Sequence, residues 1–249
     1  MPKENGLIFY RGPSMLDGAP IVGIATGFAK GSSNAKTGGD LIQTWILRSR
    51  IDPRNAAASG RDSSICGDCV HRGRIIKGAN KNRSCYVTLH HAPRNIYETF
   101  RRGVYKPSAN LAESFAGRGV RLGAYGDPAA IPFPIWEAVT SRAAFWTGYT
   151  HQWRDFPELA AYCMASADSS GERAAASLLG FRTFRVRALA DKVEAGEVIC
   201  PASAEAGHKT TCSACKACGG IGGKARADIV IRAHGSFGKA QAFERHTIR

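Results

Sequence analysis

Four of the eight cysteines gather in the segment VICPASAEAGHKTTCSACKACGG, residues 198–220. Cys212, Cys215 and Cys218 are spaced C-x2-C-x2-C, and Cys200 stands upstream with a proline directly after it. Thiolates bind zinc or iron, and a C-x2-C turn directs two sulfurs to one centre. Three closely spaced cysteines with a remote Cys-Pro are nearer to ferredoxin-type ligation than to the paired C-x2-C of a zinc ribbon. The four residues therefore predict a [4Fe–4S] cluster, with a tetrahedral zinc site as the alternative.

A second group of three cysteines, Cys66, Cys69 and Cys85, is spaced C-x2-C-x15-C. Three thiolates leave one iron of a four-iron cluster open to a further ligand. A zinc ion at the same place would take His71 or His90 as its fourth ligand. We therefore expect one or two [4Fe–4S] clusters in this chain, or zinc in their place.

The chain is strongly basic, with 34 Lys and Arg against 20 Asp and Glu and a net charge of +14. A field of this sign attracts nucleic acid and other polyanions, which are the partners that we expect. The loop between Cys69 and Cys85 is either a solvated loop or a phosphate contact held rigid by a metal. The basic residues considered for phosphate contacts are Arg72, Arg74, Lys77, Lys81, Arg83, Arg101, Arg102, Arg118 and Arg121.

The N-terminus, MPKENGLIFYRGPSMLDG, lacks the apolar region of a signal peptide, and the chain holds no membrane-spanning apolar run. We therefore expect a cytoplasmic protein that does not enter a membrane. In the reducing cytosol, clustered thiols mark metal or redox sites more often than disulfides. Cys163 stands alone among apolar residues and is expected to be a buried core thiol.

Short apolar runs and turns predict a β-rich N-terminal segment at 1–62. Over 63–249, short strands alternate with helices, which predicts βαβ units in an α/β metal-binding domain with a Cys-rich C-terminal part. The strands are too few for an eight-stranded barrel, so we expect a partial (β/α) barrel or an open parallel sheet. The expected strands are 7–12, 19–28, 41–49, 85–91, 119–126, 144–153, 163–170, 181–189, 197–203 and 227–235. The expected helices are 94–105, 132–142, 155–163, with Asp155 as N-cap, and 170–180.

Polar or ligating residues stand at the end of nearly every expected strand. Ligands of parallel α/β sheets bind at the carboxyl ends of the strands, so these positions are candidate site residues. An Asp or Ser there can equally cap the next helix, which is the simpler explanation for Asp168 and Ser169. The residues at these ends are His90, His91, Asp127, His151, Asp168, Cys200 and His234.

Four motifs between Val120 and Gly219 together match the motif order of a known family. They are VRLGAYGDP at 120–128, TGYTHQWRD.PEL around 147–159, CPA at 200–202 and TCSAC at 211–215. This run, about two-fifths of the chain, resembles the phage "gene product 88" family of cysteine-motif proteins. The resemblance implies a phage or prophage origin. It also implies that Cys66, Cys69 and Cys85-Tyr86 correspond to an upstream cysteine motif of the family.

A three-cysteine group beside the first βα unit, partial-barrel alternation and a Cys-rich tail are together similar to radical S-adenosylmethionine enzymes. This resemblance implies that Cys66, Cys69 and Cys85 hold a catalytic cluster whose open iron binds S-adenosylmethionine. It implies an auxiliary cluster at the four C-terminal cysteines. The usual C-x3-C-x2-C of these enzymes is absent. The residues that would orient cofactor or substrate are Asp127, Tyr149, His151 and Asp168.

The alternative function is a zinc-stabilised nucleic-acid-binding protein, in which zinc supplies folding energy and the basic residues bind phosphates. A rolling-circle nuclease using His90 and His91 is disfavoured, because adjacent residues of a strand point to opposite faces. No G-x-S-x-G or P-loop motif is present. An iron–sulfur enzyme of radical S-adenosylmethionine type is the function that the sequence favours.

Overall fold

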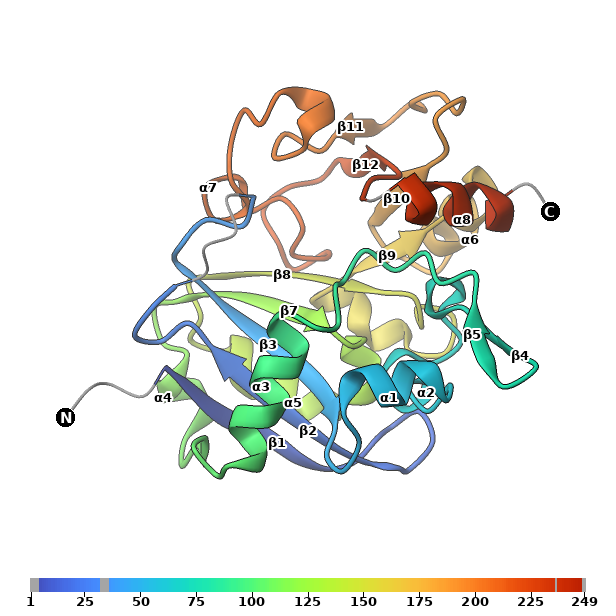
Figure 1. Ribbon diagram of the computed structural model, residues 1–249. Helices are drawn as coiled ribbons and strands as arrows, with labels where there is room; N and C mark the ends of the chain where they lie inside the picture. Colours follow the sequence, from blue (N-terminus) through green and yellow to red (C-terminus); the bar gives the residue numbers. More distant parts are fainter. Residues whose placement is uncertain (1–4, 32–35, 236, 248–249) are drawn as a thin grey trace.

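The apolar runs become the strands of one large sheet in the computed structural model, which describes residues 5–31, 36–235 and 237–247. The sheet order is β11-β12-β10-β9-β8-β7-β3-β2-β1-β6 (Figure 1). Neighbouring strands run parallel except at the β1–β2 and β2–β3 pairs. The strands are β1 (Gly6–Pro13), β2 (Pro20–Thr26), β3 (Leu41–Arg48), β6 (Lys106–Pro107), β7 (Gly119–Tyr125), β8 (Phe145–Thr150), β9 (Met164–Ala167), β10 (Thr183–Arg187), β11 (Glu197–Ile199) and β12 (Asp228–Arg232).

Helices and 3-10 turns connect these strands, and a small hairpin, β4 (Arg74–Ile76) with β5 (Ala79–Lys81), pairs only with itself among the described residues. Within the chain from 119 to 187, a helix or 3-10 turn follows each strand before its neighbour. The helices are α1 (Pro53–Ala58), α2 (Ser63–Cys66), α3 (Ala92–Arg101), α4 (Leu111–Ser114), α5 (Phe133–Thr140), α6 (Ser170–Leu178), α7 (Cys212–Cys215) and α8 (Phe237–Thr247). The 3-10 turns are η1 (Val70–Arg72), η2 (Pro128–Ala130), η3 (Pro157–Ala161) and η4 (Ala204–Ala206).

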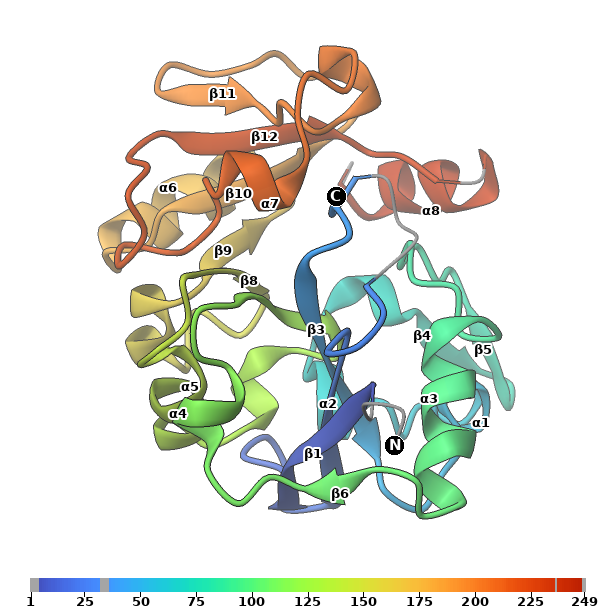
Figure 2. The same cartoon turned by 90° about the vertical axis from the view of Figure 1, so that its left-hand side faces the viewer.

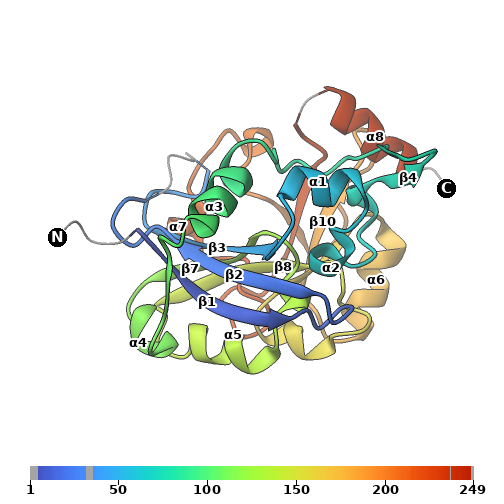
Figure 3. The ribbon, with the colours of Figure 1, turned by 60° about the horizontal axis from the view of Figure 1, so that its bottom comes forward.

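The two faces of the sheet have different neighbours. Figures 2 and 3 show α4 and α5 on one side of the sheet and α1, α3 and α8 on the other. Strand register places Arg121, Tyr149, Phe184 and Ile229 on one face, because their side chains alternate with those of the opposite face. We call the face that bears these four residues the inner face. Both cysteine groups belong to this side, as described below.

The α/β class and the mostly parallel sheet are confirmed. The sheet is open over the described residues, with β11 and β6 as its edges. Strands β1 to β3 continue the same sheet, and the division of the chain at residue 62 stays a prediction. No helix in 5–31, 36–235 or 237–247 combines the length and apolarity needed to cross a bilayer.

Several expected elements are wrong. Segment 85–91 is not a strand, because the Cys85 N–H donates to the carbonyl of His71 (3.0 Å) in the cysteine loop. The segment RIDPRNAAASGRDSS, residues 50–64, has the composition of a polar connector but contains α1 and the first two residues of α2. Asp155 does not cap the helix that follows, which is a short 3-10 turn whose N-cap is Phe156. Helix α8 was not expected at all, since its apolar residues are few and widely spaced.

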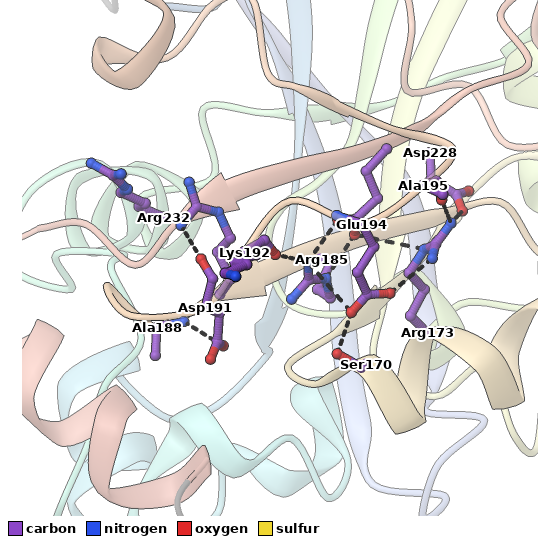
Figure 4. Close-up of polar contacts among 12 residues, drawn as sticks. Ser170, Arg173, Arg185, Ala188, Asp191, Lys192, Glu194, Ala195, Asp228 and Arg232 are labelled. Carbon is purple, nitrogen blue, oxygen red and sulfur yellow. Dashed lines mark hydrogen bonds and ion pairs between the residues drawn. The ribbon is translucent and has the colours of Figure 1, made fainter.

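A network of charges fixes the outer edge of the sheet. Arg185 of β10 and Glu197 of β11 form a two-bonded ion pair at 2.6 Å for each bond, and both side chains are buried. Arg173 of α6 joins them by pairing with Glu194 (2.9 Å) and Asp228 (3.0 Å) (Figure 4). Strand β11 has only three residues, so these pairs take the place of a long ladder of hydrogen bonds in holding it. The network thereby positions the residue that follows β11, Cys200.

Replacing Arg185 with methionine will lower the free energy of unfolding by about 3–5 kcal/mol, because the Glu197 carboxylate is left buried without its partner. Urea denaturation followed by circular dichroism measures this change. The matched control is Arg94→Met, which breaks an exposed pair with Glu98 on α3 and is expected to cost about 0.5 kcal/mol or less. Equal effects of the two substitutions would show that the buried pair does not hold the sheet edge.

Candidate metal-binding sites

The four C-terminal cysteines surround one pocket on the inner face. Cys200 follows β11, whereas Cys212 and Cys215 lie on α7 and Cys218 lies in the loop after it. All four line the pocket together with Tyr149 of β8. Cys200 is buried and the other three are partly buried. The four thiols that the sequence assigns to one site therefore line one pocket, and what they bind stays a prediction. The remaining lining residues are Lys36, Thr147, Pro201, Ala202, Ala217 and Ile229.

Backbone contacts anchor the Cys212–Cys218 loop to the sheet. The N–H of Gly148 in β8 donates to the carbonyl of Cys218 (3.0 Å). The buried Arg182 guanidinium donates to the carbonyls of Ala217 (2.9 Å) and Gly220 (3.1 Å), on either side of that cysteine. An arginine has five donors in a fixed fork, which suits it to holding several carbonyls at once. These contacts hold the loop against β8 and the Arg182 side chain.

One of the glycines after Cys218 has a packing role. Gly220 has a φ of +64°, and a Cβ there would lie 2.5 Å from the carbonyl oxygen of Ala160. Glycine is required at such a position by conformation and by space. This residue therefore brings the loop against η3, beside the sheet.

Tyr149 of β8 forms a hydrogen bond with one of the pocket cysteines. Its hydroxyl donates a hydrogen bond to the sulfur of Cys218. Burial raises the pKa of the Tyr149 hydroxyl well above 10.0, so this side chain stays a neutral donor. Burial also raises the pKa of the Cys218 thiol to about 12, while the Tyr149 bond lowers it. A hydrogen bond to sulfur is one of the ways in which a protein tunes a bound metal.

The three upstream cysteines also come together, at the carboxyl ends of β7 and β8. Burial raises the pKa of the Cys66 thiol well above 9.0, and the neighbouring thiols of Cys69 and Cys85 raise it further. The Asp127 N–H, after β7, donates to the carbonyl of Ile65 (2.6 Å). Gln152, after β8, donates to the carbonyl of Cys66 (3.3 Å). The loop is therefore tied to two strand ends, where ligands of parallel sheets bind.

A histidine beside these cysteines meets two of the expected strand-end residues. His71 Nε2 lies 2.9 Å from Asp168 Oδ2, and His151 Nε2 lies 3.9 Å from the same oxygen. The two imidazole rings are 5.2 Å apart. His71 had been considered only as a zinc ligand with the cysteines. The C-x2-C-x-H spacing places it beside the thiols, but only the fold shows that η1 directs it to Asp168.

Asp127 has a structural position. Its carboxylate accepts hydrogen bonds from the hydroxyl of Thr150 (2.7 Å), the N–H of His151 (2.8 Å) and the N–H of Ala129 (3.0 Å). Burial raises the pKa of the Asp127 carboxyl, and these donors oppose the rise. Since its oxygens already bind three protein donors, Asp127 positions His151. Its role in orienting a cofactor or substrate stays a prediction.

Three histidines expected at strand ends lie outside the group of His71, His151 and Asp168. The rings of His90 and His91 contact each other in a tilted arrangement, with centroids 4.5 Å apart, in the turn before α3, where segment 85–91 forms no strand. His234 stacks on Tyr86 at 6.0 Å, and burial lowers the pKa of its imidazole. Cys163 is fully buried, as expected for a core thiol.

One tyrosine–arginine pair lies between the two cysteine groups. Arg121 of β7 donates to the hydroxyl of Tyr86 (2.8 Å), the residue after Cys85. The Cys212 thiol and the Tyr149 hydroxyl also interact electrostatically with Arg121, whose pKa they raise against the effect of burial. The Arg121 guanidinium thus interacts with Tyr86, next to Cys85 in the sequence, and with Cys212 of the C-terminal group.

His71, His151 and Asp168 are the group of three ligand-type residues, within the described parts of the chain, whose ligand atoms all lie within 4.8 Å of one another. The thiols of either cysteine group are spaced more widely than this in any set of three. Comparisons of the chain with protein families, curated proteins and solved structures find no match. The site therefore has to be interpreted from its own geometry.

The raised thiol pKa values predict slow alkylation of the metal-free protein. Burial raises the pKa of both Cys69 and Cys218 to about 12, so both are neutral thiols at pH 8 and only the thiolate reacts. Iodoacetamide should modify them roughly 1,000-fold more slowly than the same cysteines in urea, since each pKa unit is tenfold in thiolate. Mass spectrometry of peptides measures both rates between pH 8 and 10. A native rate that levels off near pH 9 would contradict the burial of these thiols.

Proposed function

We propose that this chain is an iron–sulfur protein whose four C-terminal cysteines bind a [4Fe–4S] cluster. The observation that carries the proposal is that four thiols from two separate segments line a single pocket. The C-x2-C-x2-C spacing with a remote Cys-Pro favours an iron–sulfur core over a single zinc ion. Gly220 and Arg182 hold the loop that carries three of these cysteines against the sheet.

A second cluster at Cys66, Cys69 and Cys85 fits the other cysteine group. With three thiol ligands it would keep one iron open, as radical S-adenosylmethionine enzymes require. Two features support this enzyme type as the finer proposal. The thiols lie at the carboxyl ends of parallel strands, and β3 and β7 to β12 run in one direction as in a partial (β/α) barrel.

The residues around such a centre have separable roles. When bound, a [4Fe–4S] cluster supplies low-potential electrons, and with S-adenosylmethionine it supplies radical chemistry. Tyr149 donates a hydrogen bond to Cys218 and so tunes the C-terminal site. Asp127 holds the backbone of His151. Asp168, whose charge raises the pKa of the Cys69 thiol, and the neighbouring His151 are the residues that we propose to contact substrate or S-adenosylmethionine, directly or through a bound ion.

Metal analysis of anoxically purified protein tests the proposal. We expect a brown protein with absorbance near about 400 nm and roughly eight iron atoms per chain if both clusters form. Cys212→Ser and Cys66→Ser should each remove about four iron atoms, because each disrupts one cluster only. Cys163→Ala is the control that keeps full iron. A colourless protein with stoichiometric zinc would overturn the proposal.

A zinc-stabilised nucleic-acid-binding protein is the second candidate, and the β4–β5 hairpin favours it. Arg74, Lys77 and Lys81 are exposed there, beside the exposed Ile75 and Ile76. Other expected phosphate contacts are used inside the fold instead. Arg72 binds Asp62 (2.9 Å), Arg83 lies 3.7 Å from the same carboxylate, and Arg118 and Arg121 donate to Gly27 and Tyr86.

This second candidate predicts binding to single- or double-stranded nucleic acid that weakens steeply with salt, because each phosphate contact releases a counterion. Replacing Arg74, Lys77 and Lys81 together with glutamine should reduce the slope of log affinity against log salt by about 2–3. Fluorescence anisotropy measures both. The control replaces the exposed Arg142, which follows α5, and should change the slope less. Binding that does not depend on salt would rule this function out.

A further inference from the structure

We propose that His71, His151 and Asp168 form a binding site for one divalent transition-metal ion, separate from the cysteine sites. Two imidazole nitrogens and one carboxylate oxygen converge within 4.8 Å of one another. They come from three segments that are distant in the sequence: η1, the end of β8 and the end of β9. This donor set, two histidines and one carboxylate, suits Mn²⁺, Fe²⁺ or a similar ion and leaves positions open for water or substrate oxygen.

The distances fit an ion better than they fit hydrogen bonding alone. The His71–Asp168 contact of 2.9 Å is a normal hydrogen bond, but His151 Nε2 lies 3.9 Å from the same oxygen, beyond hydrogen-bond range. Ligands bound at about 2.0–2.2 Å around one ion stand roughly 3.0–3.5 Å apart. The two observed separations lie on either side of that range. Small rotations of the side chains would therefore bring the three atoms to ligand geometry.

The surroundings of His71 match those of a metal ligand. Its other ring nitrogen, Nδ1, lies 2.7 Å from the hydroxyl of Ser84, and its ring stacks on Phe243 of α8 at 5.5 Å. A metal ligand must have Nε2 free of a proton, which places the proton on Nδ1. A serine hydroxyl can accept as well as donate, so Ser84 suits that form. Such outer hydrogen bonds orient the imidazole of a ligating histidine.

The site also has access and a fixed backbone. The side chain of His151 is 28% exposed, whereas those of His71 and Asp168 are 12% and 11% exposed. An ion can therefore arrive from the His151 side. The Asp127 carboxylate accepts a hydrogen bond from the His151 N–H (2.8 Å) and so fixes the backbone position of this histidine. Asp168 is held in turn by its own N–H, which donates to Glu172 (2.8 Å).

Titration of the full-length protein with Mn²⁺, followed by electron paramagnetic resonance, tests the site. Mn²⁺ prefers nitrogen and oxygen ligands to thiolates, so the cysteine groups do not compete for it. We expect the six-line signal of free Mn²⁺ to disappear up to one ion per chain. Asp168→Asn and His151→Gln should abolish this binding, and Ser84→Ala should weaken it roughly tenfold or more. His208→Gln, which changes a histidine outside the site, is the control and should bind as the unmodified protein does.

Circular dichroism shows whether each variant is folded, and bound Mn²⁺ should raise the melting temperature of the unmodified protein and of His208→Gln only. If Asp168→Asn does not fold, His151→Gln decides, because its partly exposed side chain can change at little cost. The absence of stoichiometric Mn²⁺ binding to the unmodified protein would overturn the proposal. So would binding that persists in a folded Asp168→Asn or His151→Gln variant. Neither outcome depends on whether the cysteines bind iron.

Discussion

The carboxylate of Asp127 is the constraint on which the arrangement of both upstream sites depends. It accepts from Thr150 and from the N–H of His151, so it fixes the ends of β7 and β8 relative to each other. The backbone N–H of Asp127 donates to the carbonyl of Ile65, the residue before Cys66. A buried acceptor of this kind is costly to leave unpaired, which is why the chain segments must meet at this point. One side chain thereby sets the positions of a cysteine loop and of a histidine.

The downstream site is built on a different principle. Cys200 is carried by a strand of three residues that charge pairs hold in the sheet, whereas the Cys212–Cys218 loop is held by backbone contacts to β8 and by Arg182. Ion pairs fix direction as well as distance, because the arginine fork binds a carboxylate in one plane. The pocket is thus assembled from two independently anchored pieces. The thiols converge because both anchors belong to the same sheet, in which β12, β10 and β9 lie between β11 and β8.

The parallel sheet could be predicted from the sequence because its strands are short, apolar and separated by helices. The placement of Asp127, His151 and Asp168 at strand ends followed from the same pattern. The partnership of His71 with Asp168 could not be predicted, since it joins residues 97 positions apart and depends on how the short 3-10 turn η1 is placed against the sheet. Segment 85–91 looked like a strand because its residues are apolar. Its backbone is instead held by His71, a contact that no local pattern signals.

The Tyr86–Arg121 pair gives the inner face a permanent positive charge between two groups of thiols. Arginine keeps its proton at every pH at which the protein is folded, so this charge does not vary. A Cys212 thiolate is attracted to this guanidinium, which lowers the pKa of that thiol against the effect of burial. On the Cys85 side the attracting cations are Arg83 and Lys239 instead. Each group of thiols therefore has its own built-in counterion, and Arg121 serves the C-terminal group.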